Sequence, residues 1–193
     1  MRSFYLLVFV ILGYASAFSQ SSLMEGDDSG AGVSYNYSMY NNHIYMHGLS
    51  IGYSIKRELD ISLGYAIGPK SSTIGASIGV NIFKNGFIMV SPSISLLLIK
   101  AYKVSADGYA LGLTFSKKFH ISEKFGIVPY ANIAFVNISS RTQVYEESKM
   151  SLSMGLDFVL KPKEDFYWGL SCSTGFSDSL TDMVNSVGGF VIF

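Results

Sequence analysis

Residues 74–82 have the sequence IGASIGVNI, and this stretch decides the fold class. Its even-numbered positions are Ile, Ala or Val, whereas its odd-numbered positions are Gly, Ser or Asn. Successive side chains of a β-strand point to opposite faces of the sheet, so a period of two is typical of a strand and not of a helix. We therefore predict a strand with aliphatic side chains on one face and small or polar side chains on the other.

The same alternation recurs along the chain from residue 32 onward, for example in residues 49–55, 109–115 and 150–158. Repeated alternation of this kind predicts an all-β chain. The even number of strands fits a closed antiparallel up-and-down transmembrane β-barrel of about ten strands. An eight-stranded barrel, in which the first two strands are merged or lost, stays open as an alternative. The ten expected strands are 32–41, 45–56, 60–67, 73–83, 87–100, 107–118, 125–138, 148–160, 165–176 and 184–193.

Composition supports a membrane barrel over a soluble domain. Charged residues make up 15% of the 193-residue chain, where soluble domains have about 25%. After the N-terminal segment, no apolar run is long enough for a transmembrane helix, which needs roughly 20 residues. Lys+Arg and Asp+Glu both number 14, so the chain lacks the basic excess expected of a nucleic-acid binder. Cys172 is the only cysteine, so no disulfide forms within the chain.

The N-terminus has the pattern of a secretory signal peptide. Arg2 supplies the positive charge, residues 4–12 are apolar, and Ala15-Ser16-Ala17 is a small-residue cleavage site. We predict a signal peptide over residues 1–19, cut after Ala17 or after Ser19. Residues 20–31 are polar and rich in Gly, Ser and Asp, which predicts a flexible periplasmic lead-in. The barrel then occupies residues 32–193.

The two faces of the strands indicate what surrounds them. A soluble β-sandwich or lipocalin-like barrel usually carries Lys, Glu and Thr on its non-aliphatic face, but here that face is mainly Gly, Ser, Ala and Thr. Small polar residues suit a narrow lumen, with the aliphatic face turned to lipid. Asp157 alternates with Ser153 and Gly155, so we predict that it faces the lumen and makes a structural bond there. The residues predicted to face lipid are Leu49, Ile51, Tyr53, Ile78, Val80, Leu111, Leu113, Leu152, Leu156, Trp168 and Leu170.

The last strand ends on an aromatic residue, Phe193. Together with the cleavage site at residues 15–17 and the alternating strands from Val33 onward, this terminal Phe makes the chain similar to the small outer-membrane barrels of Gram-negative bacteria. That group includes the barrel domains of OmpA-like and OmpW-like proteins. The resemblance implies integral residence in the bacterial outer membrane. It also implies recognition of Phe193 by the barrel-assembly machinery, and outer-membrane lipid as a partner.

The connections between the strands predict which end faces which side. Charged turns at 56–60, 84–86, 120–124 and 162–165 are compact, whereas the connections at 99–108, 139–148 and 177–185 are longer. In outer-membrane barrels the short turns are periplasmic and the longer loops are extracellular. We therefore expect the compact turns and both chain ends on the periplasmic side.

Two groups of residues have catalytic or metal-binding chemistry. His120, Ser122 and Glu123 have the residue types of a base, a nucleophile and an orienting carboxylate, as in outer-membrane lipid A deacylases. They fall in a charged turn, which favours a solvated segment. His43 and His47 would lie about 13 Å apart in an extended strand, too far to share a metal, so we expect no metal and no cofactor.

The sequence therefore predicts a location and a shape better than an activity. A structural or surface-interaction role is the favoured function. The alternatives are a narrow conduit for small or apolar solutes and, less favoured, a lipid-modifying enzyme. Composition and spacing do not identify a transported solute, a native partner, an oligomeric state or a conducting lumen.

Overall fold

The computed structural model describes residues 29–40, 44–56, 58–69, 71–84, 88–101, 104–140, 146–163, 166–177 and 183–193. The predicted signal peptide over 1–19 and most of the predicted lead-in, residues 20–28, lie outside these residues. So does His43. In the described part of the chain, no helix is long and apolar enough to cross a membrane.

Twelve β-strands make up the described chain. They are β1 (Gly30–Tyr40), β2 (Ile44–Ile55), β3 (Leu59–Gly68), β4 (Ser71–Val80), β5 (Ile82–Lys84), β6 (Ile88–Ala101), β7 (Val104–Ser116), β8 (Phe119–His120), β9 (Phe125–Ser140), β10 (Glu146–Lys163), β11 (Phe166–Ser177) and β12 (Met183–Ile192).

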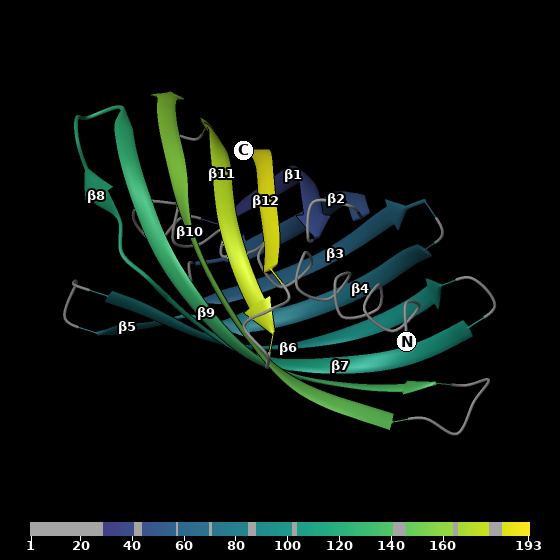
Figure 1. Ribbon diagram of the computed structural model, residues 1–193. Coiled ribbons are helices and arrows are strands. Elements are labelled where there is room, and N and C mark those ends of the chain that lie inside the picture. Colours follow the sequence, from purple (N-terminus) through teal and green to yellow (C-terminus); the bar gives the residue numbers. More distant parts are fainter. Residues whose placement is uncertain are drawn as a thin grey trace.

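All neighbouring strands pair antiparallel, and the sheet closes on itself. The order runs from β10 through β11, β12 and β1 to β2, β3, β4, β6, β7 and β9, and β9 pairs with β10 again. The short strand β5 continues β4 along β6, and the short strand β8 continues β7 along β9. Counting each of these pairs as one strand, the closed barrel has ten strands. Figure 1 shows the strands wrapped around a common interior, with β11 and β12 in front of β1 to β4. The predicted ten-stranded closed barrel is confirmed and the eight-stranded alternative is wrong.

Two of the ten barrel strands, β4–β5 and β7–β8, are interrupted, and each interruption lies opposite a proline. β4 pairs with β6 up to Gly79 and β5 resumes at Ile82 in the same register, which places Pro92 of β6 opposite the gap. β7 and β8 likewise pair with β9 in one register, and Pro129 lies opposite the gap between them. Proline has no backbone N–H to donate, so the ladder loses a bond at both places.

The strands extend further than the alternation predicted. β6 ends at Ala101 and β7 begins at Val104, so most of the expected loop 99–108 is strand. β9 ends at Ser140 and β10 begins at Glu146, so half of the expected loop 139–148 is strand. The barrel also begins two residues earlier than predicted, at Gly30. Backbone pairing continues through these polar segments because ladder hydrogen bonds do not depend on alternating side chains.

We call the two ends of the barrel the turn end and the loop end. The turn end holds the connections after β2, β5, β8 and β10, together with Phe193, whereas the loop end holds those after β1, β3, β6, β9 and β11. At the turn end β10 contacts the connection after β8, because the Lys161 N–H donates to the Lys124 carbonyl at 2.8 Å. Phe193 also lies there, and its backbone exchanges two 2.9 Å hydrogen bonds with Ala31.

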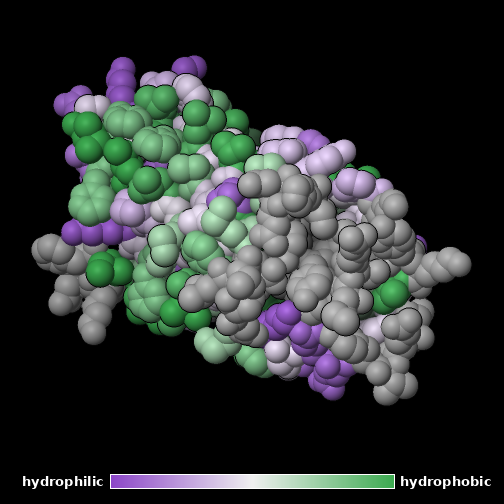
Figure 2. Space-filling view, viewed as in Figure 1, coloured by the Kyte–Doolittle hydropathy of each residue, from purple (hydrophilic) through white to green (hydrophobic). Residues whose placement is uncertain are grey.

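Large apolar side chains cover the outside of the barrel. Many are half-exposed, among them Leu96 at 63% and Leu170 at 58%, although water-soluble proteins rarely expose apolar patches of such extent. In Figure 2, hydrophobic residues gather over the strands labelled β9 to β11 in Figure 1, and hydrophilic residues lie at the upper ends of these strands. This distribution is that of an apolar belt bounded by polar ends.

Candidate functional site: the barrel interior

The interior changes polarity along β6, and the change defines the site. The inward residues of this strand are Ser91, Ser93 and Ser95 toward the turn end, followed by Leu97 and Ile99 toward the loop end. Neighbouring strands repeat the pattern. On β9, Asn132 lies on the polar side of the change, and Val136 and Ile138 on the apolar side. The interior is thus polar in one half and apolar in the other along these strands.

The apolar half packs into a cluster at the loop end, which we call the loop-end cluster. Each of its side chains is at most 5% exposed, so the cluster is tightly packed. Its members come from β6, β7 and β9: Leu97, Ile99, Ala106, Ala110, Ala134, Val136 and Ile138.

A second apolar cluster, the turn-end cluster, occupies the other side of the barrel at the opposite end. It consists of Val128, Val159, Tyr167 and Ile192, with Phe190 packed against them. The ammonium groups of Lys118 and Lys161 lie 5.5 and 5.3 Å from the centre of the Tyr167 ring. Cations over an aromatic face are attracted by its negative potential, so the two lysines cover this cluster with charge. The two clusters therefore fill opposite ends of the interior on different sets of strands.

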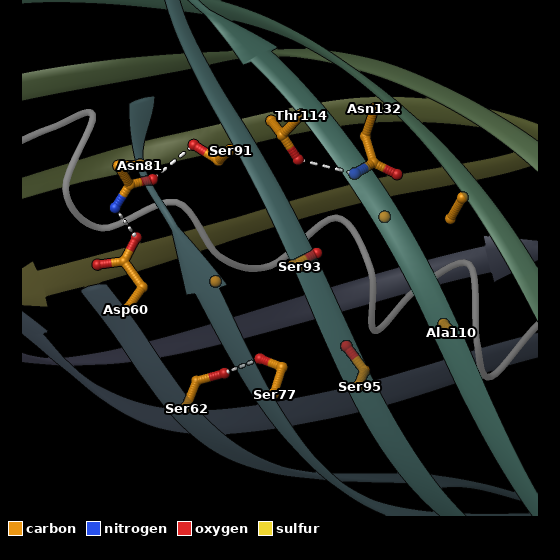
Figure 3. A pocket seen from close by; sticks show the side chains of 13 residues that line it. Asp60, Ser62, Ser77, Asn81, Ser91, Ser93, Ser95, Ala110, Thr114 and Asn132 are labelled. Atoms are coloured by element: carbon orange, nitrogen blue, oxygen red, sulfur yellow. Dashed lines mark hydrogen bonds between the residues drawn. The ribbon is translucent and has the colours of Figure 1, made fainter. Parts of the chain in front are cut away.

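Between the loop-end cluster and the turn end lies a polar cavity with about 630 Å³ of empty space, part of it open to solvent. Its walls come from β3, β4, β6, β7 and β9, with Asn81 between β4 and β5 (Figure 3). Gly79, Gly112, Ala110 and Ala134 are among the lining residues, and their small size leaves the space open.

Hydrogen bonds fix several of the polar groups of the cavity wall. Asn81 donates its Nδ2 to Asp60 Oδ2 at 3.0 Å and accepts the Ser91 hydroxyl on its Oδ1 at 2.5 Å. Asn132 Nδ2 donates to Thr114 Oγ1 at 2.7 Å (Figure 3). These bonds connect neighbouring strands inside the barrel and hold the amide groups in defined orientations.

Asp157 lies on the inward face of β10, is partly buried, and is not among the residues that line the cavity. Its carboxylate accepts a hydrogen bond from Ser171, the residue opposite it on β11. Tyr130 lies nearby over Gly155, its direct partner in the β9–β10 ladder, and a Cβ at Gly155 would come 2.5 Å from the Tyr130 hydroxyl oxygen. Gly155 thus provides the space for the Tyr130 ring. The Asp157 carboxylate is bound by the Ser171 hydroxyl and not by a cation.

The eleven residues predicted to face lipid all lie on the outer surface. Their exposed fractions range from 36% for Leu113 to 58% for Leu170. Cys172 is also exposed on this face, and its thiol lies 3.7 Å from the Leu156 carbonyl oxygen. Phe193, the predicted assembly signal, is 61% exposed.

The possible catalytic group does not form a pocket. His120 ends β8, and Ser122 and Glu123 lie in the connection between β8 and β9; all three are exposed at the turn end. Ser122 there has a structural role, because its Oγ accepts the Lys124 N–H at 3.4 Å and its backbone bonds that of Phe125. This geometry is that of a solvated turn, with the serine hydroxyl bonded to the backbone of its own turn.

His47 lies on the outer surface of β2 among tyrosines. Its Nδ1 is 2.6 Å from the Tyr35 hydroxyl oxygen, and the Tyr37 ring centre is 5.3 Å away. In the described part of the chain, no three His, Cys, Asp or Glu side chains come close enough to hold a metal ion.

Comparison with known proteins supports the fold. No protein-family model matches the chain, and no curated protein matches it in sequence. Among solved structures, it is similar to the β domain of the Bordetella autotransporter BrkA, with a TM-score of 0.51 and 12% identity over 88% of this chain and 99% of that one. The fold is that of a bacterial outer-membrane β-barrel. With its apolar outer surface, the chain is an integral outer-membrane protein.

Two other solved structures are similar at lower TM-scores. The KdgM porin matches with a TM-score of 0.48 and 11% identity, over 82% of this chain and 97% of that one. Ail, the attachment invasion locus protein of Yersinia pestis, matches with a TM-score of 0.36 and 16% identity, over 88% of this chain and 100% of that one.

Sequence reasoning missed the two apolar clusters and the polar cavity. The signal for the loop-end cluster is a loss of alternation at residues 96–99, where four successive residues are Leu, Leu, Leu and Ile. Here the outward residues Leu96 and Leu98 are exposed, so the additional apolar residues Leu97 and Ile99 mark an apolar interior. The cavity has a fainter signal in Asn81 and Asn132, two amides at inward positions of aliphatic strands.

Proposed function

We propose that this protein is a non-conducting barrel with a structural and surface-interaction role in the outer membrane. The observation that carries the proposal is the loop-end cluster, whose seven side chains pack at the end opposite Phe193. A hydrated ion moving along β6, β7 and β9 would meet these apolar side chains. Along β9 to β12 it would meet the turn-end cluster. A filled interior is also what a small barrel normally has.

A surface-interaction role rests on the same geometry. Each of these two sets of strands carries an apolar cluster at one end, which favours a function at the outer surface and the loop end over transport. The tyrosines around His47 are one feature of that surface, since amphipathic rings favour the membrane interface.

A narrow conduit is the second candidate, and the polar cavity favours it. The cavity is partly open to solvent and lined by hydroxyl and amide groups, which suit a small polar solute. Passage would require the loop-end cluster to move aside, which the tight packing of Leu97 and Ile99, each 2% exposed, opposes. An enzymatic role has no comparable support, because the His120 group forms no pocket.

Current recordings in planar bilayers test the proposal. The wild-type protein should show no steady unitary currents, whereas the double variant Leu97→Ser with Ile138→Ser should show frequent openings, because it makes the loop-end cluster polar. Leu98→Ser is the matched control, since Leu98 is the outward neighbour of Leu97 and is 53% exposed. Steady unitary currents from the wild type would overturn the proposal in favour of the conduit.

A further inference from the structure

We infer that the polar cavity is a binding site for a small, neutral, polyhydroxylated solute that enters from the turn end. The cavity combines an enclosed shape with a wall of hydroxyl and amide groups. This inference goes beyond the structural role proposed above and does not depend on it.

The shape of the cavity is that of a pocket closed at one end. Its lining reaches from Asp60 and Asn81, near the turn end of β3 and β4, to Ala110 and Ala134. Both alanines are also members of the loop-end cluster, each at most 5% exposed, so the cluster forms the floor of the pocket. A solute can therefore enter only from the turn-end side along these strands.

The wall chemistry selects the class of ligand. The polar lining consists of serine and threonine hydroxyls, two asparagine amides and one carboxylate, Asp60. Hydroxyls both donate and accept hydrogen bonds, and a ligand that does the same can satisfy them in either direction. Neutral polyols have this property at every hydroxyl group.

The same lining disfavours other ligand classes. No Lys or Arg is among the described residues that line the cavity, so an anion would have no charged partner. A divalent cation prefers several carboxylates, but Asp60 is the one acidic residue in this lining, and its Oδ2 already accepts the Asn81 amide. An apolar ligand would leave the hydroxyls of the wall without partners.

The middle of the cavity offers groups that a ligand can reach. Ser93 and Ser95 are half-buried and lie on β6 between the fixed Asn81–Ser91 pair and the loop-end cluster (Figure 3). Gly112 faces them from β7, and a Cβ there would come 2.7 Å from Ser93 Oγ. Gly112 therefore leaves open the space beside the Ser93 hydroxyl, which a larger side chain would fill.

Ligand binding by the full chain in detergent micelles, followed by saturation-transfer NMR, tests the inference. Glycerol and D-glucose are the polyol probes, and succinate and tetramethylammonium represent anions and cations. We expect saturable binding of a polyol in the millimolar range, since each hydrogen bond to the wall replaces one to water. Absence of polyol binding, or saturable binding of succinate or tetramethylammonium instead, would overturn the inference.

Two variants localise the site. Ser95→Leu extends the loop-end cluster into the cavity and should abolish binding, whereas Ser139→Leu, the same substitution at an exposed position of β9, should leave it unchanged. Ser93→Ala removes one hydroxyl and should weaken binding by about 2- to 13-fold, the loss expected for one hydrogen bond. Unchanged polyol binding in the Ser95→Leu barrel, with its fold verified by strand circular dichroism, would place the solute elsewhere and refute the assignment.

Discussion

A charge placed on the outer face of the barrel should destabilise it according to its depth in the membrane. Leu111 is 49% exposed on β7, between Ile94 of β6 and Phe135 of β9 in the strand register. β7 has 13 residues, so Ala110 is its midpoint and Leu111 is the next residue. With a rise of about 3.4 Å per residue and a tilt of about 40°, Leu111 lies about 3 Å from the middle of the strand along the membrane normal. It therefore lies near the centre of the hydrocarbon.

The expected effect of Leu111→Lys follows from this depth. A Lys at the bilayer midplane on the lipid face of a barrel lowers the free energy of unfolding by about 2–4 kcal/mol. This corresponds to a shift of roughly 30- to 900-fold in the folding equilibrium. Ile121→Lys is the control, because Ile121 is 62% exposed but lies in the connection between β8 and β9, beyond the end of β7. Its effect should stay within about 0.5 kcal/mol.

Equilibrium unfolding by urea in phospholipid vesicles measures both variants, with Trp168 fluorescence as the signal. The refuting result is a Leu111→Lys barrel as stable as the Ile121→Lys barrel. That outcome would mean that the aliphatic face of β7 meets water, as in a soluble β-sandwich.

Two further substitutions test the interior. Gly155→Ala should destabilise the barrel by about 1–3 kcal/mol, because the new Cβ would come 2.5 Å from the Tyr130 hydroxyl and 2.6 Å from the Cys172 carbonyl oxygen. Gly79→Ala is its control and should be neutral or slightly stabilising, since nothing lies nearer than 3.5 Å; equal urea midpoints for the two variants would contradict this account. Asn81→Ala should lower stability by about 1–3 kcal/mol through loss of its bonds to Asp60 and Ser91, and a stability unchanged from wild type would mean that these bonds contribute nothing.

The period of two was sufficient to predict most of the barrel. Alternation places Leu111 and Leu113 on one face and Gly112 and Thr114 on the other whatever the partner strand, because the direction of a side chain is a local property of the strand. The ten barrel strands and the outward position of the aliphatic residues could therefore be predicted without coordinates.

The interior could not be predicted in the same way, because it depends on register. Gly155 and Tyr130 lie 25 positions apart and meet only because β9 and β10 pair in one particular register. The Asn81 network likewise joins Asp60 and Ser91 from two different strands. The breaks opposite Pro92 and Pro129 also need knowledge of the partner strand. Side-chain alternation alone carries no information about which inward residues face each other.

Contact between the outer face and hydrocarbon is tested most directly with Trp168, the single tryptophan of the chain, which is 42% exposed on the outer surface near the start of β11. The measurement is quenching of its fluorescence in vesicles of phospholipids with brominated acyl chains. We predict strong quenching, greater when the bromines are near the headgroup than when they are near the terminal methyl, and weak quenching by aqueous iodide. Fluorescence that is insensitive to brominated lipid and fully quenched by iodide would contradict the account.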